Sequence, residues 1–309
     1  MRVEYRQEPC KSALNRVKGM MFDWSLNPYM GCVHRCTFCY VRAFERRADR
    51  PSDDRYGQSI RVKVNVAEVL RRELSRASWE HETIAIGAAT DPYQPAEGHY
   101  RLTRGCLEAL ADAHNSFSII TRGPMIVRDV DVLTEAARRA DVSVTFSIPT
   151  LDDAIWRLTE PGTAPPRQRL RAVRMLADAG ILVGVAMAPI LPGLSDRPEL
   201  LADTVKAARD AGAARIWTEL VHLSPGTREH FLGTLAALWP AEAARLSTMY
   251  ARRDYAPQPE RQANAARVAA LVKAHPRRPS APHWIEPEPP RLAVQLGLAF
   301  DGMTERGAA

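Results

Sequence analysis

Short apolar runs alternate along the chain with segments of helical period, from about residue 22 to about residue 225. The runs are apolar on both faces, as strands covered by helices on both sides are. The segments between them place apolar residues three and four positions apart, which is the spacing of an amphipathic helix. The pattern predicts six strands, at 22–30, 83–90, 117–121, 142–148, 181–190 and 215–223, and helices at 66–77, 103–114, 130–139, 166–179 and 198–211.

This alternation predicts an α/β fold with a parallel sheet covered by helices, and a core domain over residues 21–225. Periodicity does not distinguish an open doubly wound sheet from a barrel or partial barrel. Residues 1–20 show no clear period and are expected to form an N-terminal extension. Residues 226–309 are expected to form a helical and proline-rich C-terminal extension. Its predicted helices are 226–238, 241–252 and 263–273, and residues 292–300 of its extended tail are a candidate segment for docking on the core.

Composition and charge restrict the possible locations and partners of the protein only slightly. No run of about 18 apolar residues occurs, so no membrane-spanning helix is expected, and the first residues lack the apolar stretch of a secretory signal. We therefore expect a cytoplasmic protein. The net charge is +6, with arginines concentrated at 42–61 and 167–174. Such runs permit contact with nucleic-acid phosphates, but we favour solvated helix faces as the explanation.

Three cysteines gather in the loop that follows the first predicted strand. Cys32, Cys36 and Cys39 have the spacing Cys-x3-Cys-x2-Cys, while the other two cysteines of the chain are distant in sequence. Thiolates are soft ligands, which favours an iron–sulfur cluster or zinc. Structural zinc needs a fourth ligand, and the nearby candidate is His34. A cubane cluster instead binds three thiolates on three irons and leaves the fourth iron open, so we predict a [4Fe–4S] cluster here.

The cysteines, with Phe38 and Tyr40 on either side of the third, resemble the signature of the radical S-adenosylmethionine superfamily. More narrowly, residues 27–32 (Asn-Pro-Tyr-Met-Gly-Cys) and 90–95 (Thr-Asp-Pro-Tyr-Gln-Pro) resemble the spore photoproduct lyase-like, or DNA repair photolyase-like, group. The resemblance implies a partial (β/α)6 barrel that holds the cluster and S-adenosylmethionine. It also implies an external reductant such as flavodoxin or ferredoxin. The expected reaction is reductive cleavage of S-adenosylmethionine to a 5'-deoxyadenosyl radical, which abstracts hydrogen from a substrate.

Polar residues follow the predicted strands at their carboxyl ends, where ligands of parallel α/β folds bind. The resemblance implies that Thr90 and Asp91 meet the amino group of the cosubstrate, although the Gly-Gly-Glu of many family members is absent here. It further implies that Arg122 pairs with the carboxylate and that Ser147 bonds the ribose hydroxyls. Adenine would lie against Phe38, Tyr40 and Met187. The alternatives are that Asp91 caps the turn opened by Pro92 and that Met187 packs in the core.

The candidates for further catalytic residues are Tyr93, Glu97 and Cys106. A thiol can return a hydrogen atom, as in photoproduct lyases, but Cys106 also fits a small buried residue among apolar neighbours. The substrate is not identified by the sequence. Nucleic acid is the leading class, with a protein or small molecule as the alternative. Outside enzymes, the alternative is a non-catalytic nucleic-acid-binding metalloprotein.

Overall fold

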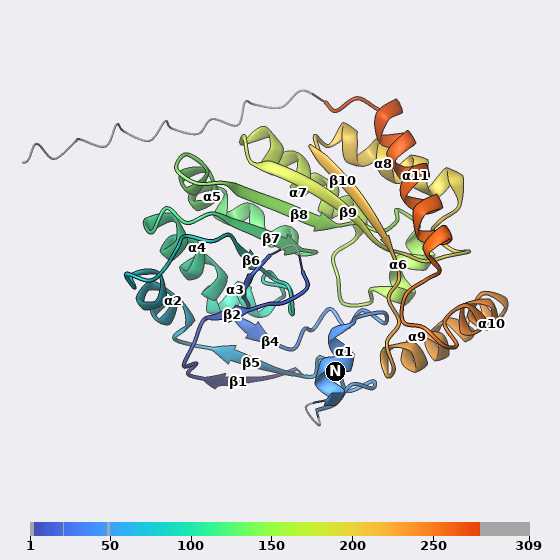
Figure 1. The fold of residues 1–309 in the computed structure, drawn as a ribbon, viewed down its shortest axis with the longest axis horizontal. Helices are drawn as coiled ribbons and strands as arrows, with labels where there is room; N and C mark the ends of the chain where they lie inside the picture. The colour runs from blue at the N-terminus through green and yellow to red at the C-terminus, as the bar shows by residue number, and fades with distance from the viewer. Residues whose placement is uncertain (1–2, 21, 48–49, 279–309) are drawn as a thin grey trace, which may run out of the picture.

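The computed structural model describes residues 3–20, 22–47 and 50–278, and its centre is a seven-stranded sheet (Figure 1). The strands lie in the order β10-β9-β8-β7-β6-β3-β2, and all neighbours are parallel except β2, which is antiparallel to β3. Their bounds are β2 Leu14–Arg16, β3 Trp24–Leu26, β6 Ile84–Ile86, β7 Phe117–Thr121, β8 Val142–Ser147, β9 Leu182–Ile190 and β10 Arg215–Leu220.

The six parallel strands confirm the predicted α/β fold, and their order decides its architecture. From β3 to β10, each strand of this sheet pairs with the strand of the same sheet that comes before it in the sequence. The order of the strands across the sheet therefore never reverses. A doubly wound sheet has such a reversal, where its two halves meet. The two ends of the sheet, β10 and β2, are not paired with each other. The sheet is therefore a partial barrel.

Helices connect the parallel strands and cover the sheet, as their apolar periodicity predicts. Val66, Val69, Leu70 and Leu74 form the buried stripe of α2. Both α7 and α8 begin with a proline in the first turn, where its missing N–H costs no hydrogen bond. The helices between β4 and β10 in the sequence are α1 Val41–Arg47, α2 Val66–Leu74, α3 Ala96–Tyr100, α4 Leu102–Asp112, α5 Val130–Ala137, α6 Asp153–Thr159, α7 Pro166–Asp178 and α8 Pro198–Asp210, with a 3-10 helix at Pro124–Asp129.

The predicted strand at 22–30 is two strands in different sheets. Pro28, which lacks the N–H of a central strand residue, separates β3 from β4 (Tyr29–Met30). β4 joins a second, three-stranded sheet with β5 (Ser59–Lys63) and β1 (Glu4–Glu8). Residues 1–20, for which no regular element is predicted, thus contribute both β1 and β2. These strands are short and mostly exposed, so they carry little apolar pattern.

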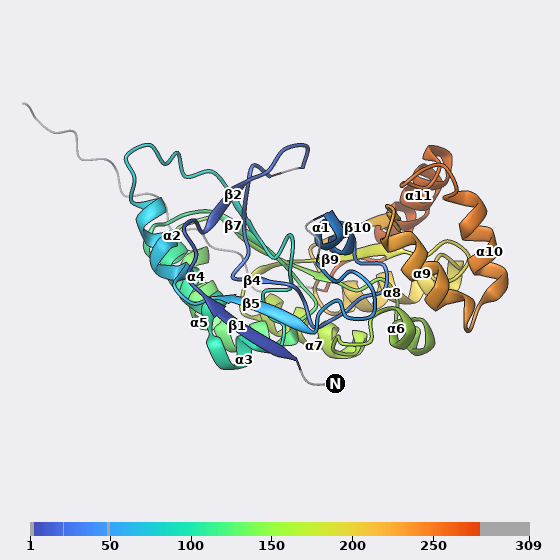
Figure 2. The same cartoon turned by 90° about the horizontal axis from the view of Figure 1, so that it is seen from below.

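Three further helices follow the last strand, at α9 Thr227–Ala236, α10 Pro240–Met249 and α11 Gln258–Ala274. They lie together at the β10 end of the molecule, where α11 packs against β10 and α8 (Figure 2). The proline-rich tail and its candidate docking segment at 292–300 lie outside the described residues. Among the helices of the described ranges, none has the length and apolarity to cross a membrane.

Candidate active site

A cavity of about 390 Å³ opens at the carboxyl ends of the parallel strands, the edge at which ligands are expected. This volume lies within the usual range of small-molecule sites. The cavity is bounded on one side by the loop of the three cysteines and on the other by residues that end or follow the strands. The strand-end residues are Gly87–Asp91, Ile120–Arg122, Ser147, Ala188, Pro189, Trp217 and Glu219–His222.

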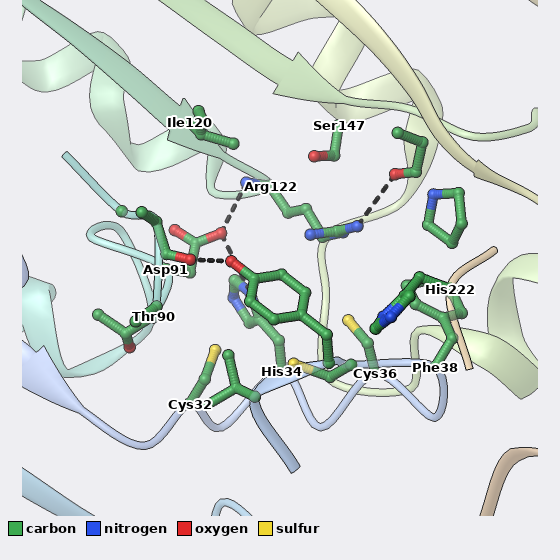
Figure 3. A pocket seen from close by; sticks show the side chains of 18 of the residues that line it. Cys32, His34, Cys36, Phe38, Thr90, Asp91, Ile120, Arg122, Ser147 and His222 are labelled. Atoms are coloured by element: carbon green, nitrogen blue, oxygen red, sulfur yellow. Dashed lines mark hydrogen bonds and ion pairs between the residues drawn. The ribbon is translucent and has the colours of Figure 1, made fainter. Parts of the chain in front are cut away.

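All three cysteines of the motif line this cavity, and Figure 3 shows Cys32 and Cys36 on the loop that forms its lower side. Within the described ranges, no three Cys, His, Asp or Glu side chains converge as ligands of one metal ion do. The arrangement therefore does not match the zinc alternative with His34. It is compatible with a cubane, because the cysteine ligands of a cubane bind different irons. Burial raises the pKa of the Cys36 and Cys39 thiols, so bound iron would supply the charge that keeps them as thiolates.

The segment after β6 holds the cysteine loop through hydrogen bonds to its backbone. The Thr90 hydroxyl donates to the Gly31 carbonyl oxygen at 2.7 Å, and the Gln94 amide nitrogen donates to the same oxygen at 3.1 Å. The Gln94 side-chain oxygen accepts from the Val33 N–H at 3.2 Å. Both motifs that carry the photolyase-like resemblance thus meet at this junction.

Asp91 is a buried acceptor for four donors. Its Oδ1 accepts from the Tyr93 N–H at 2.8 Å and the Thr121 hydroxyl at 2.7 Å. Its Oδ2 accepts from the Arg122 N–H at 2.6 Å and lies 3.3 Å from His34 Nδ1. A carboxylate has about four acceptor positions, so these partners use its capacity. The contact with the Tyr93 N–H matches the turn-capping alternative, and it leaves little capacity for the predicted contact with a cosubstrate amino group.

The Asp91–His34 contact is a charged pair in a buried place. Burial alone would raise the pKa of Asp91, but the charge of His34 and the surrounding hydrogen bonds lower it to about 2. Burial alone would lower the pKa of His34. The negative charges of Cys32 and Asp91 outweigh burial and raise the pKa of His34 to about 10. His34 therefore links the cysteine loop to Asp91, which is tied in turn to the end of β7.

On the opposite wall, a buried carboxylate holds the guanidinium of Arg122. Arg122 Nε donates to Glu160 Oε1 at 3.2 Å, and Arg169, which is fully buried, forms a second ion pair with Glu160. Burial raises the pKa of Glu160, but the charges of Arg169 and Arg122 outweigh it and leave that pKa lowered. The Arg122 guanidinium also lies 5.7 Å from the centre of the Phe38 ring. A fixed cation therefore stands at the cavity wall, between Ser147 and Cys36 in Figure 3.

Two residues beneath the cysteine loop do not stand out in the sequence. Tyr56 lines the cavity, is 2% exposed, and places its hydroxyl oxygen 3.5 Å from the Cys39 sulfur. Arg42 is 1% exposed, although the sequence suggests a solvated helix face for it and for the buried Arg169. Charge alone does not reveal a buried arginine. The only local signal is the position of Arg42 three residues after Cys39.

The model of the Radical SAM superfamily matches residues 26–205 of this chain. The chain belongs to the radical SAM superfamily. It is 36% identical over 297 residues to an uncharacterised protein of Mycobacterium tuberculosis (strain ATCC 25618 / H37Rv). The aligned region covers 95% of this chain and 86% of that protein. An uncharacterised protein of Acidianus two-tailed virus is 29% identical over 217 residues, covering 66% of this chain and 69% of that protein. The match of the family model, over more than half of the chain, confirms the family and, with it, an enzyme.

Solved structures of spore photoproduct lyase share this radical SAM fold. A lyase complexed with dinucleoside spore photoproduct superposes with a TM-score of 0.63 and 13% identity, over 87% of this chain and 79% of that one. A variant with bound AdoMet and the same dinucleoside gives a TM-score of 0.62 and 15% identity over the same shares. At this identity the likeness concerns the fold, and it agrees with the partial barrel described above.

Most residues expected to contact AdoMet in this radical SAM enzyme line the cavity, with one exception. Phe38, Tyr40 and Ser147 line it, and the Tyr40 hydroxyl donates to the Ala88 carbonyl oxygen on the facing segment. Met187 is fully buried in the hydrophobic core and is not among the lining residues, which favours the core-packing alternative over contact with adenine. Side chains alternate along a strand, and the next residue of β9, Ala188, faces the cavity instead.

None of the three candidates for further catalytic residues lines the cavity. The Tyr93 hydroxyl donates to Asp129 Oδ2 at 3.0 Å. Glu97 is fully buried and accepts from the Tyr29 hydroxyl at 2.5 Å and the Arg128 guanidinium at 2.7 Å. Cys106 is fully buried in the hydrophobic core, and burial raises its pKa well above the usual range. All three stabilise the fold beside α3 and α4.

Polar and aromatic side chains surround the far side of the cavity, near β10 and the C-terminal helices. Trp217 is half-exposed, and Glu219 forms two hydrogen bonds with the Arg261 guanidinium, at 2.9 and 3.2 Å. The His222 ring lies 4.4 Å from that of Tyr255, and burial lowers the pKa of His222. This side of the cavity therefore offers aromatic and charged side chains to a bound group.

Proposed function

We propose that Cys32, Cys36 and Cys39 bind a [4Fe–4S] cluster and that this chain reductively cleaves S-adenosylmethionine. The observation that carries the proposal is the gathering of all three motif cysteines on one cavity at the carboxyl ends of the parallel strands. When bound, a reduced cluster would supply the single electron that splits the sulfonium carbon–sulfur bond of S-adenosylmethionine into methionine and a 5'-deoxyadenosyl radical. A reductant such as flavodoxin or ferredoxin would supply that electron to the protein.

The residues around the cavity bind and orient the cosubstrate in this proposal. Arg122, fixed by Glu160, offers its planar guanidinium to the carboxylate of S-adenosylmethionine. Ser147 faces the ribose, and Phe38 and Tyr40 offer apolar surface to the adenine. The amino group would meet the segment Gly87–Thr90, whose residues line the cavity beside Cys32. The bonds from Thr90 and Asp91 to the rest of the site hold that segment in place.

For the substrate, we infer a nucleic acid as the leading class. A spore photoproduct lyase of the same fold is solved with a dinucleoside spore photoproduct. The net charge of +6 favours an anionic partner, and Trp217 and Tyr255 offer half-exposed rings for base stacking near the cavity.

The positions of the cysteines favour a reaction other than that of photoproduct lyases, or a substrate other than nucleic acid, such as a protein or small molecule. Among the described residues, the thiols that line the cavity are those assigned to the cluster. Cys106 lies in the core, and Cys10 lies beside β5, near Asn65. Neither thiol stands where it would return a hydrogen atom to a substrate radical, as a photoproduct lyase requires. We therefore propose that this protein generates the radical, and we do not assign the lyase reaction to it.

Anaerobic reconstitution with iron and sulfide tests this proposal. About four irons per chain with broad visible absorption, and 5'-deoxyadenosine after addition of dithionite and S-adenosylmethionine, are the expected results. A colourless protein with one zinc per chain would overturn it. For the substrate, binding to DNA or RNA that weakens steeply with salt would support the nucleic acid. No binding at low salt would favour the protein or small-molecule alternative.

A further inference from the structure

A hydroxyl group stands beside one of the three cluster sulfurs. The Tyr56 oxygen lies 3.5 Å from Cys39 Sγ, which is within hydrogen-bond distance for sulfur. A cysteine bound to iron is a thiolate and has no proton to give, so in that state the phenol is the only donor of the pair. The side chain is almost completely buried, so water does not compete for the bond.

The loop that carries Tyr56 is held rigidly against the cysteine loop. Arg42 stacks over the Tyr56 ring, with 4.5 Å from its guanidinium carbon to the ring centre. The same guanidinium donates to the carbonyl oxygens of Ser52 and Asp53 at 2.8 Å and to that of Cys36 at 3.3 Å. Arg35 Nε donates to the Tyr56 carbonyl oxygen at 3.1 Å. These bonds join both loops and fix the direction of the phenol.

Gly57 brings the two loops into close contact. It has a φ of +77°, and a Cβ built on it would lie 2.4 Å from the Cys32 carbonyl oxygen. Only a glycine allows this approach without a shift of the backbone. The position of the Tyr56 hydroxyl beside Cys39 is therefore determined by the backbone on both sides of the contact.

We propose that Tyr56 donates a hydrogen bond to the Cys39 thiolate and thereby sets the reduction potential of the cluster. Hydrogen bonds to ligating sulfurs are among the factors that determine the potential of an iron–sulfur centre. Reduction adds one negative charge to the cluster, which strengthens a bond donated to its sulfur. The bond thus stabilises the reduced state and makes the cluster easier to reduce. This inference rests on the proposed function, because it needs the cluster to be present.

The test compares midpoint potentials of reconstituted wild type, Tyr56→Phe and Tyr93→Phe, by dithionite titration followed by EPR of the reduced cluster. Tyr93 is a matched control, because it is equally buried but its hydroxyl donates to Asp129 away from the cavity. Tyr56→Phe should be harder to reduce, with the reduced-to-oxidised ratio at a given potential lower by about tenfold, or about 59 mV for one electron. Tyr93→Phe should leave the potential unchanged.

A Tyr56→Phe protein with wild-type iron content and an unchanged midpoint would overturn the inference and leave the proposed function intact. A wild-type protein that binds no cluster would instead refute the proposed function. If Tyr56→Phe does not assemble a cluster, 3-fluorotyrosine at position 56 keeps the hydroxyl and makes it a stronger donor. Its midpoint should rise above that of wild type, and a midpoint equal to or below wild type would overturn the inference.

Discussion

The carboxylate of Asp91 is a buried group at which a single polar change should destabilise the protein. In Asp91→Asn, one of the two oxygens becomes an NH2 group, and neither placement of that group is compatible with the site. At Oδ1 it would face the Tyr93 N–H and the Thr121 hydroxyl. At Oδ2 it would face the Arg122 N–H and His34. In both cases a donor opposes a backbone donor that has no room to move.

The cost follows from the number of buried groups that lose their partner. An unsatisfied buried donor costs about 1–3 kcal/mol, and loss of one member of a buried ion pair costs about 3–5 kcal/mol. We therefore predict that Asp91→Asn loses about 3–5 kcal/mol of unfolding free energy. Because the segment 90–94 holds the cysteine loop, the variant should also retain less iron after reconstitution.

The assay is urea unfolding of the cluster-free protein followed by circular dichroism, with iron content measured after reconstitution. Asp131→Asn is the control, because Asp131 pairs with Arg104 on the surface and its side chain is 62% exposed. Such pairs contribute about 1 kcal/mol at most. A loss of less than about 1 kcal/mol in Asp91→Asn, with iron content equal to that of wild type, would refute the role assigned to this carboxylate.

Three further predictions concern the same site. Gly57→Ala should lower iron content well below that of Gly19→Ala, since both glycines have positive φ but only the Cβ at 57 meets backbone atoms; equal iron content in the two variants would contradict this. Glu160→Gln should lower the unfolding free energy by about 3–5 kcal/mol, because two guanidinium groups lose their buried counter-charge; an unchanged urea midpoint would contradict it. The pKa of Asp91 is lowered to about 2 in the folded protein, so its carboxylate stabilises the folded state fully above the pKa of an unfolded carboxyl group. This contribution is lost as the pH falls from about 4 towards 2. The unfolding free energy of wild type should therefore fall more steeply over that range than that of Asp91→Asn, and parallel pH profiles would refute the assignment.

The parallel core could be predicted because its strands are buried on both faces. A run such as 181–190 contains no polar side chain, and β9 occupies Leu182–Ile190. β1 and β2 could not be predicted in the same way, because short exposed strands need few apolar residues. Their positions depend on pairing with β5 and β3, which are distant in sequence.

The candidate site was predictable where its residues are local and not where they depend on packing. The cysteine spacing and the strand ends placed the cavity correctly, since both are properties of short segments. For Met187 the sequence could not decide between the cavity and the core, because the register of β9 relative to the cavity is set by its neighbours. Tyr56 was missed because only tertiary contacts, through Arg42 and Gly57, bring its loop under Cys39.

In the proposed function, Cys32, Cys36 and Cys39 would hold a [4Fe–4S] cluster that binds S-adenosylmethionine. The most direct measurement is ENDOR spectroscopy of the reduced cluster with S-adenosylmethionine labelled with 15N in the amino group and 17O in the carboxylate. We expect hyperfine coupling to both labels, and no such signal when Cys36 is replaced by alanine. A reduced cluster that shows no coupling to either label, with S-adenosylmethionine present at saturation, would contradict it.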